Sequence, residues 1–179
     1  KDYKNMISMD LKEVDNLVLI IGKTEGHIDQ SLFARTILDE KNGPPPEINL
    51  FNEKNNGESL LNLIDKNYIK SAHDISLGGL ITALSKMCIK GNKGVKLNKP
   101  KNLINEIEYY FAEDQGRYLI EIDPKDFEKV TDILNKNSVH HEKLGVIIKN
   151  EMIINDKTKV TIDELKSYNS NWLIDYMSA

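Results

Sequence analysis

The chain has 179 residues, of which 40% are hydrophobic and 29% charged, and its formal net charge is −4. These proportions are those of an ordinary globular protein with one sizeable core. The negative charge argues against a general nucleic-acid or membrane-surface binder. No apolar run approaches the roughly 20 residues of a membrane helix. The single cysteine, Cys88, excludes an internal disulfide.

The first part of the chain predicts a strand, a loop and a helix in succession. Residues 1–16 are polar and are expected to form a connecting segment. The continuous apolar run 17–21 predicts a buried strand, and the polar segment 23–27 follows as a loop. Apolar residues then recur at helical spacing over 31–38. This order favours a ligand loop at the end of the strand; an ordinary turn between strand and helix is the alternative.

The middle of the chain repeats this pattern. A glycine followed by three prolines in 42–46 predicts an extended surface loop. Residues 50–64 predict a helix, and a helix interrupted near Gly57 is the alternative. Residues 68–72 predict a central strand, and a helix follows Gly79. Cys88 falls on the apolar face of that helix, which favours a buried structural thiol.

The rest of the chain is richer in strands. A short strand is expected around Val95 between Gly91 and Pro100. Asp123 and Pro124 are typical of a helix start, and the buried side of that helix would carry Val130, Ile133 and Leu134. Further strands are expected at 119–122, 144–148, 152–154 and 160–162.

Residues 144–148 and 152–154 are expected to pair as a hairpin around 149–151, and a final helix is expected over 163–177. Because strands and helices alternate first and strands dominate later, we predict an α/β protein, a mixed α+β sandwich formed by a single domain over 17–179. The absence of a signal peptide favours the cytosol, and a start without methionine indicates a fragment of a longer chain.

A loop with chemistry-bearing residues follows the central strand, in the sequence His73-Asp74-Ile75-Ser76-Leu77-Gly78-Gly79. The two glycines allow positive φ and a close approach to the backbone. The N–H groups that open the next helix suit a phosphate. Asp74 is a hard oxygen ligand for Mg²⁺ beside phosphates, and Ser76 can cap the helix or contact a phosphate oxygen. The alternative is a capped, tightly packed turn without a ligand, since the P-loop ending is missing.

A second polar stretch precedes the strand at 119–122. Glu113, Asp114 and Gln115 place two carboxylates and an amide together, which alone is typical of a solvated turn. Arg117 is expected to pair with Glu113 or Asp114 in an exposed ion pair that adds little stability. His73 can position a substrate group or form a loop hydrogen bond. The spacing of the four histidines does not indicate a structural zinc site.

Three motifs occur in a fixed order, at 22–27, 73–80 and 111–118. Together with the proline-rich loop they resemble the C-terminal domain of the synthetase subunit of the phosphoribosylformylglycinamidine synthase family. The motif His-Asp-x-Ser-x-Gly-Gly-Leu is shared with a wider superfamily that includes aminoimidazole ribonucleotide synthetase. The motif Glu-Asp-Gln-x-Arg-Tyr is more particular to this enzyme family. The resemblance runs from about Asp15 to Ile122 and more loosely to the end.

The resemblance implies part of an ATP-dependent ligase of purine biosynthesis in the cytoplasm. The family converts formylglycinamide ribonucleotide and ammonia to the amidine, with release of ADP and phosphate. ATP and Mg²⁺ are the implied cofactors. The implied partners are the earlier synthetase domains of the same chain, a glutaminase subunit and a small accessory subunit.

The resemblance also implies roles for individual residues. Asp74 would hold Mg²⁺, and Ser76, Gly78 and Gly79 would bind nucleotide phosphate. The residues expected to line a substrate site or an auxiliary nucleotide site are His73, Glu113, Asp114, Gln115 and Arg117.

Two positions depart from the family pattern. Leu77 stands where the family has an acidic residue, and Asp29-Gln30 replaces part of a glycine-containing loop. The family's catalytic histidine and principal ATP-binding domain belong to earlier parts of the chain. We therefore expect no catalytic residue in these 179 residues, and a fragment that folds without catalysing the reaction. The alternatives are a non-catalytic structural domain around an auxiliary nucleotide, or another ATP-using member of the superfamily such as selenophosphate synthetase or thiamine-phosphate kinase.

Overall fold

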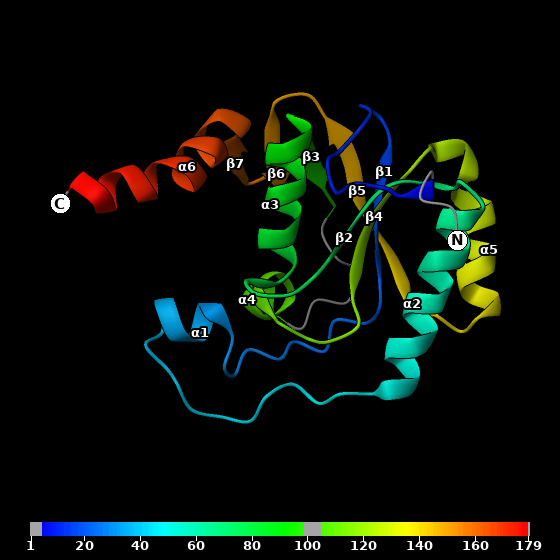
Figure 1. The fold of residues 1–179 in the computed structure, drawn as a ribbon, viewed down its shortest axis with the longest axis horizontal. Helices are drawn as coiled ribbons and strands as arrows, with labels where there is room; N and C mark the ends of the chain where they lie inside the picture. Colours follow the sequence, from blue (N-terminus) through cyan, green and yellow to red (C-terminus); the bar gives the residue numbers. More distant parts are fainter. Residues whose placement is uncertain (1–4, 99–104, 179) are drawn as a thin grey trace.

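The computed structural model describes residues 5–98 and 105–178 and forms a mixed α/β domain (Figure 1). Residues 1–4 of the expected connecting segment and Pro100 lie outside the described residues. The elements in chain order are β1 (Leu17–Ile21), α1 (Leu32–Ile37), α2 (Leu50–Asp65), β2 (Ile69–Asp74), α3 (Gly79–Gly91), β3 (Gly94–Leu97), α4 (Glu106–Phe111), β4 (Tyr118–Ile122), the 3₁₀ turn η2 (Pro124–Asp126), α5 (Phe127–Lys136), β5 (His141–Ile148), β6 (Glu151–Ile154), β7 (Thr158–Thr161) and α6 (Ile162–Ser178).

The strands form one seven-stranded sheet in the order β2-β4-β1-β5-β3-β6-β7. All neighbours are antiparallel except β3 and β6, which are parallel. The expected hairpin between 144–148 and 152–154 is therefore wrong, because β3 lies between β5 and β6. Glycine makes this insertion possible: a Cβ at Gly94 would clash with the backbone of Glu151, and one at Gly145 would clash with that of Lys96.

Helices cover both faces of the sheet and give it two apolar cores (Figure 1). On one face α3 and α4 pack on the sheet, joined by the start of α6. On the other face α2 and α5 pack on β1 and β4. Cys88 is buried in the first core, as predicted, and burial raises its thiol pKa to about 12.

Two helices go beyond the sequence prediction. The helix α2 runs through Gly57 without an interruption, because one glycine within a helix costs only about 1 kcal/mol and the helix is anchored by its buried residues Asn56, Ser59 and Leu63. The helix α4 was not expected within the tyrosine-rich stretch. Asn105 caps it by accepting the N–H groups of Ile107 and Glu108.

The segment before β1 lies against the sheet. Leu11 is buried in the first core, and its N–H donates to the carbonyl of Met87. The carboxylate of Glu121, on β4, is fully buried and accepts four hydrogen bonds, at 2.7–3.0 Å, from Lys12 N, Glu13 N, Asn16 Nδ2 and Ser71 Oγ. Residues 12–16 are therefore fixed to β4 and β2 by one side chain. Within the described ranges, no helix combines the length and the apolar character needed to cross a bilayer.

Candidate functional site

Three loops that carry the sequence motifs meet at one edge of the sheet. Both β1 and β2 run antiparallel to β4, so their carboxyl ends lie beside its first residue. Tyr118 is paired with Ile21 on one side and with Asp74 on the other. The loop after β1, the loop after β2 and the segment before β4 are therefore neighbours, although up to about ninety residues separate them in sequence.

A pocket of about 370 Å³ opens between these loops and α2. The part of its lining that comes from the motifs includes Asp74, Ser76, Leu77, Glu113 and Gln115. The remaining lining residues are Asp29, Gln30, Pro46, Glu53, Ile75, Gly116, Arg117 and Tyr118. A second pocket, of about 770 Å³, lies between the loop 23–27 and the start of α2, and shares Glu53 and Gln115 with the first.

The side chains of Asp74, Ser76 and Leu77 are exposed at this pocket. Leu77, the residue expected to depart from the family pattern, is 57% exposed. The Asp74 carboxylate has one near neighbour, the Nδ1 atom of His73 at 3.2 Å, and its side chain is 61% exposed. His73 is largely covered, and its contact with Asp74 joins the last two residues of β2. Asp74 and Ser76 are thus free to contact a ligand.

Gly78 and Gly79 have φ of +84° and +69°, as the sequence predicted for a glycine pair that opens a helix. Their N–H groups already have partners within the chain. Gly78 N donates to Glu113 Oε1 at 2.8 Å, and Gly79 N donates to the carbonyl of Ser76 at 3.0 Å. An ideal Cβ at Gly79 would lie 2.7 Å from the carbonyl oxygen of Ala112. The close approach at Gly79 is therefore made by the chain's own backbone.

Glu113 connects two elements through one oxygen. Its Oε1 accepts the N–H of Leu32, the first residue of α1, at 2.7 Å, and the N–H of Gly78 at 2.8 Å. Ser31 caps the same helix by accepting the N–H of Ala34. A carboxylate is favourable at both positions, because free N–H groups at the start of a helix carry partial positive charge. Glu113 consequently holds α1 and the loop 74–79 together.

Asp114 performs a similar task for the loop after β1. The residue is buried, and its carboxylate accepts the N–H groups of Glu25, Gly26 and His27 at 3.0–3.1 Å. Its side chain therefore determines the shape of that loop. Gln115, by contrast, is exposed and lines both pockets.

Arg117 forms the expected ion pair with Asp114, but the expectation that this pair is exposed is wrong, because both side chains are buried. Arg117 is 1% exposed, and its guanidinium donates to Ala112 O at 2.6 Å, Thr24 Oγ1 at 3.0 Å and Asp114 O at 3.1 Å. The Asp114 carboxylate lies 3.8 Å away. Burial lowers the pKa of Arg117, and the Asp114 charge opposes this effect. The arginine is buried because it satisfies carbonyl oxygens that have no sheet or helix partner.

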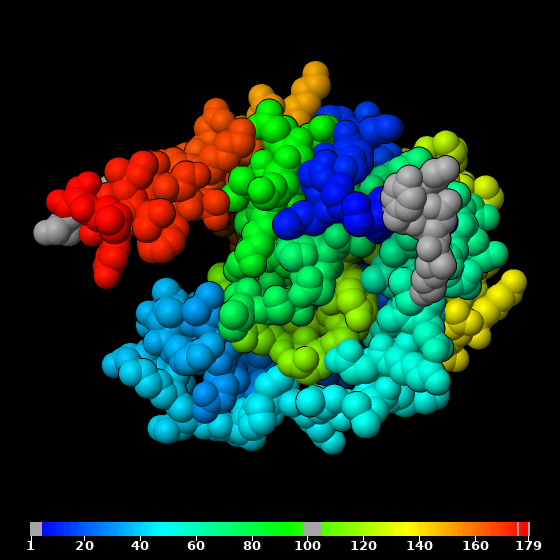
Figure 2. All heavy atoms as spheres, in the orientation of Figure 1, coloured from blue at the N-terminus to red at the C-terminus, as the bar shows by residue number. Residues whose placement is uncertain are grey.

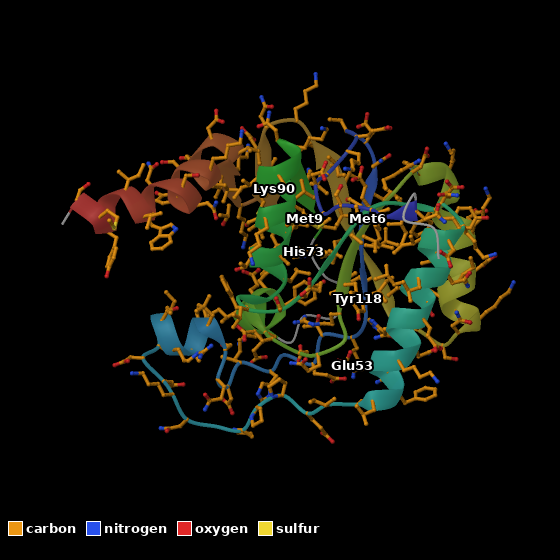
Figure 3. The ribbon with its side chains drawn as sticks, in the orientation of Figure 1. Met6, Met9, Glu53, His73, Lys90 and Tyr118 are labelled. Atoms are coloured by element: carbon orange, nitrogen blue, oxygen red, sulfur yellow. The ribbon has the colours of Figure 1, made fainter. Side chains whose placement is uncertain are left out.

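Glu53 and Tyr118 are pocket residues that the sequence did not indicate as candidates (Figure 3). Burial raises the pKa of the Tyr118 phenol, and the carboxylates of Glu53 and Asp74 raise it further. Tyr118 belongs to the third motif, but only the folded structure shows that it lies beside a carboxylate. Glu53 could not be identified as a site residue from the sequence, since a single glutamate in the first turn of a helix is common.

The fit of this site to Mg²⁺ depends mainly on Asp74. Within the described part of the chain, no three His, Cys, Asp or Glu side chains are grouped closely enough to hold a metal ion. Protein sites for Mg²⁺ beside phosphates commonly use one or two carboxylates, the remaining ligands being water and phosphate oxygens. An exposed Asp74 suits that arrangement as a single oxygen ligand.

The chain is similar to curated proteins named phosphoribosylformylglycinamidine synthase subunit PurL. The chain is 67% identical over 177 residues to phosphoribosylformylglycinamidine synthase subunit PurL of Pelagibacter ubique, covering 99% of this chain and 24% of that one. It is 34% identical over 163 residues to PurL of Caldanaerobacter subterraneus, covering 91% of this chain and 22% of that one. The chain thus spans about a quarter of the length of these curated relatives.

Solved structures share the fold. A structure of Thermotoga maritima PurL in complex with FGAR matches with a TM-score of 0.74 and 19% identity, over 91% of this chain and 30% of that one. A complex of the same protein with ATP matches with a TM-score of 0.68 and 18% identity, over 91% of this chain and 27% of that one.

The family model described as AIR synthase related protein, C-terminal domain, matches residues 13–157. This range contains all three motif segments and the residues that form the contacts between them. It also contains every strand of the sheet except β7, the last strand in the chain. The chain therefore belongs to the family of AIR synthase related C-terminal domains.

Proposed function

We propose that the chain is the C-terminal domain of the synthetase subunit of phosphoribosylformylglycinamidine synthase. The observation that carries the proposal is the 67% identity to a PurL protein across 99% of this chain. The reaction would be the ATP-dependent conversion of formylglycinamide ribonucleotide and ammonia to formylglycinamidine ribonucleotide, ADP and phosphate. The proposal includes a cytoplasmic location.

The exposed residues of the loop after β2 are assigned to nucleotide binding. Asp74 would supply one oxygen ligand to Mg²⁺, and Ser76 would donate its hydroxyl hydrogen to a phosphate oxygen. Bound Mg²⁺ would neutralise phosphate charge. Asp29, Glu53 and Glu113 add further carboxylates to the lining of the pocket. These carboxylates would repel a phosphate without a cation, so the lining supports a requirement for Mg²⁺.

We assign the glycines and the segment before β4 to shaping this site. The N–H groups of Gly78 and Gly79 are held by Glu113 and Ser76, so these glycines would fix the loop and contact no phosphate directly. Asp114 and Arg117 would maintain the loop 23–27. His73 would orient Asp74, and Gln115 would face the ligand, since it is exposed at both pockets.

The catalytic groups would come from the rest of a longer chain, and ammonia from a glutaminase subunit, with a small accessory subunit as a further partner. A structure named PurLQS from Thermotoga maritima, similar in fold to this chain with a TM-score of 0.67, supports an assembly of that kind.

A second candidate is a non-catalytic domain that encloses a fixed auxiliary nucleotide. One feature favours it: Leu77 provides no charge where the family has an acidic residue. A nucleotide that stays bound and unhydrolysed through many turnovers of the full-length protein would support this candidate.

The test uses the full-length chain that carries this segment, and the 179-residue chain beside it. The full-length chain, supplied with formylglycinamide ribonucleotide, ATP and Mg²⁺, is expected to release ADP in proportion to added ammonia. The 179-residue chain is expected to release none. Absence of ammonia-dependent ADP release from the full-length chain would contradict the proposed reaction, and release by the short chain would contradict the assignment of catalytic groups to other domains.

A further inference from the structure

The helix α6 begins in the core of the domain and then leaves it. Ile162 is 3% exposed, and Leu165 packs on the first core. The start of the helix is fixed, because Glu164 Oε2 accepts the N–H of Thr161 at 2.8 Å. Beyond Lys166 every described side chain is exposed. The second half of α6 stands clear of the body in both views (Figures 1 and 2).

The buried face of α6 continues along the exposed half. At 3.6 residues per turn, Trp172, Leu173 and Tyr176 share the face that buries Ile162 and Leu165 near the start. These three side chains are 62%, 51% and 74% exposed. A charged or polar face would be expected if this half of the helix were made to remain in water. The exposed half also carries Tyr168, Ile174 and Met177 on its other sides, and the face that continues the buried one has no partner within the described residues.

An open notch separates the end of α6 from α1, and is visible at the left of the molecule (Figure 2). The region of α1 also exposes large apolar side chains, namely Leu32 at 40%, Ile37 at 67% and Leu38 at 48%. A single protein surface bound in the notch would cover both the apolar face of α6 and the apolar side chains near α1. It would also contact the helix whose first N–H is held by Glu113.

The area of this apolar face of α6 is too small to bind a separate protein stably. A stable interface buries about 800 Å² on each side, whereas a large aromatic side chain contributes at most about 150–250 Å² when fully covered. Two partly exposed aromatics and a leucine fall short of that area. A partner in the same polypeptide needs less, because its effective concentration is high and little further freedom is lost when it docks.

The comparisons indicate where such a partner would come from. The matched family model ends at residue 157, before α6 begins, so the shared domain does not require this helix. The Pelagibacter relative nevertheless aligns over 177 residues, which include nearly all of α6, and this chain covers only 24% of it. The helix therefore accompanies the longer chain.

We propose that α6 docks through Trp172, Leu173 and Tyr176 on an apolar surface of another domain of the longer synthetase chain, within the notch beside α1. This interface rests on the proposed function in one respect, the existence of that longer chain. It joins this domain to its neighbour on the side where α1 lies (Figure 1).

Hydrogen exchange of residues 167–178 tests the interface without any measurement of turnover. In the full-length chain these amides are expected to exchange roughly tenfold more slowly, or slower still, than in the 179-residue chain. In the full-length chain, Tyr176→Glu is expected to abolish the protection. Ile174→Glu is the matched control, since Ile174 is 64% exposed but lies on the opposite side of the helix. In the Ile174→Glu variant, the amides of residues 167–178 should remain protected from exchange.

Neither substitution should change the unfolding midpoint of the 179-residue chain, because both side chains are exposed there. Equal exchange in the two chains, or equal loss of protection in both variants, would overturn the interface. So would a concentration-dependent dimer of the 179-residue chain that Tyr176→Glu abolishes, since a second copy would then be the occupant. Protection in a full-length chain without synthetase activity would retain the interface and reject only the proposed reaction.

Discussion

The two polar loops on either side of Tyr118 use their charges differently. In the segment Ala112–Arg117, the carboxylates of Glu113 and Asp114 and the guanidinium of Arg117 all bond to groups of the same chain. In the loop 74–77, the side chains of Asp74 and Ser76 are exposed at the pocket.

This difference separates two roles that a motif alone does not distinguish. Charges that satisfy backbone groups hold loops in place. Where they are buried, as Asp114 and Arg117 are, their loss leaves polar atoms unpaired in a dry interior. Exposed groups contribute little to stability and remain available to a ligand. We therefore expect substitutions before β4 to reduce stability, and substitutions after β2 to reduce binding.

The largest effect on stability is expected from Arg117→Met. The substitution leaves Ala112 O and Thr24 Oγ1 without this donor and the Asp114 carboxylate without its nearby cation, at a cost of about 3–5 kcal/mol. The measurement is denaturant unfolding of the 179-residue chain. Arg35→Met is the control, because Arg35 is exposed and its loss should change stability by less than about 0.5 kcal/mol. Equal effects of the two substitutions would contradict a structural role for Arg117.

A smaller loss is expected from Glu113→Ala, about 1–3 kcal/mol, since the N–H groups of Leu32 and Gly78 lose an ionised acceptor. Unfolding measures the cost, and faster hydrogen exchange at Gly78 locates it. Glu40→Ala, at an exposed position, is the control. Unchanged exchange at Gly78 would show that Glu113 does not hold the loop.

The smallest effect concerns the titration of Tyr118. Its pKa in the folded protein is raised above the ordinary value of 10.0. The phenol therefore contributes stability that is fully present below pH 10 and is lost as pH rises through the folded pKa. Glu53→Gln removes one carboxylate that raises this pKa, so it should lower the pKa, as followed by NMR titration of the Tyr118 ring. Glu58→Gln is the control on the same helix. A pKa that Glu53→Gln leaves unchanged would rule out the expected coupling.

The strands around the site could be predicted from sequence because their evidence is local. The apolar run 17–21 and the strand before Asp74 gave β1 and β2, and the glycine pair gave the positive φ of Gly78 and Gly79. The neighbour of β5 could not be predicted in this way. The turn at 149–150 is local, but the insertion of β3 depends on residues some fifty positions earlier, whose contacts form only in the folded sheet.

The buried state of Arg117 was unpredictable for a similar reason. Its neighbours Glu113, Asp114 and Gln115 are polar, which is typical of an exposed turn. The backbone groups that Glu113 and Asp114 bind lie in the loop 23–27 and at Leu32 and Gly78, so only the fold reveals their partners. Composition shows that charges are present, whereas tertiary contacts decide which of them remain free.

The most direct test of this division compares Asp74→Asn with Asp132→Asn in the full-length chain, by ammonia-dependent ADP release and by thermal unfolding. Asp132 is an exposed carboxylate on α5. Both variants should keep stability within about 0.5 kcal/mol of the unsubstituted chain. Only Asp74→Asn should lose turnover, by roughly tenfold or more, through weaker binding of the magnesium nucleotide. Unchanged turnover with reduced stability in Asp74→Asn would contradict the assignment, and would make the loop after β2 part of the scaffold.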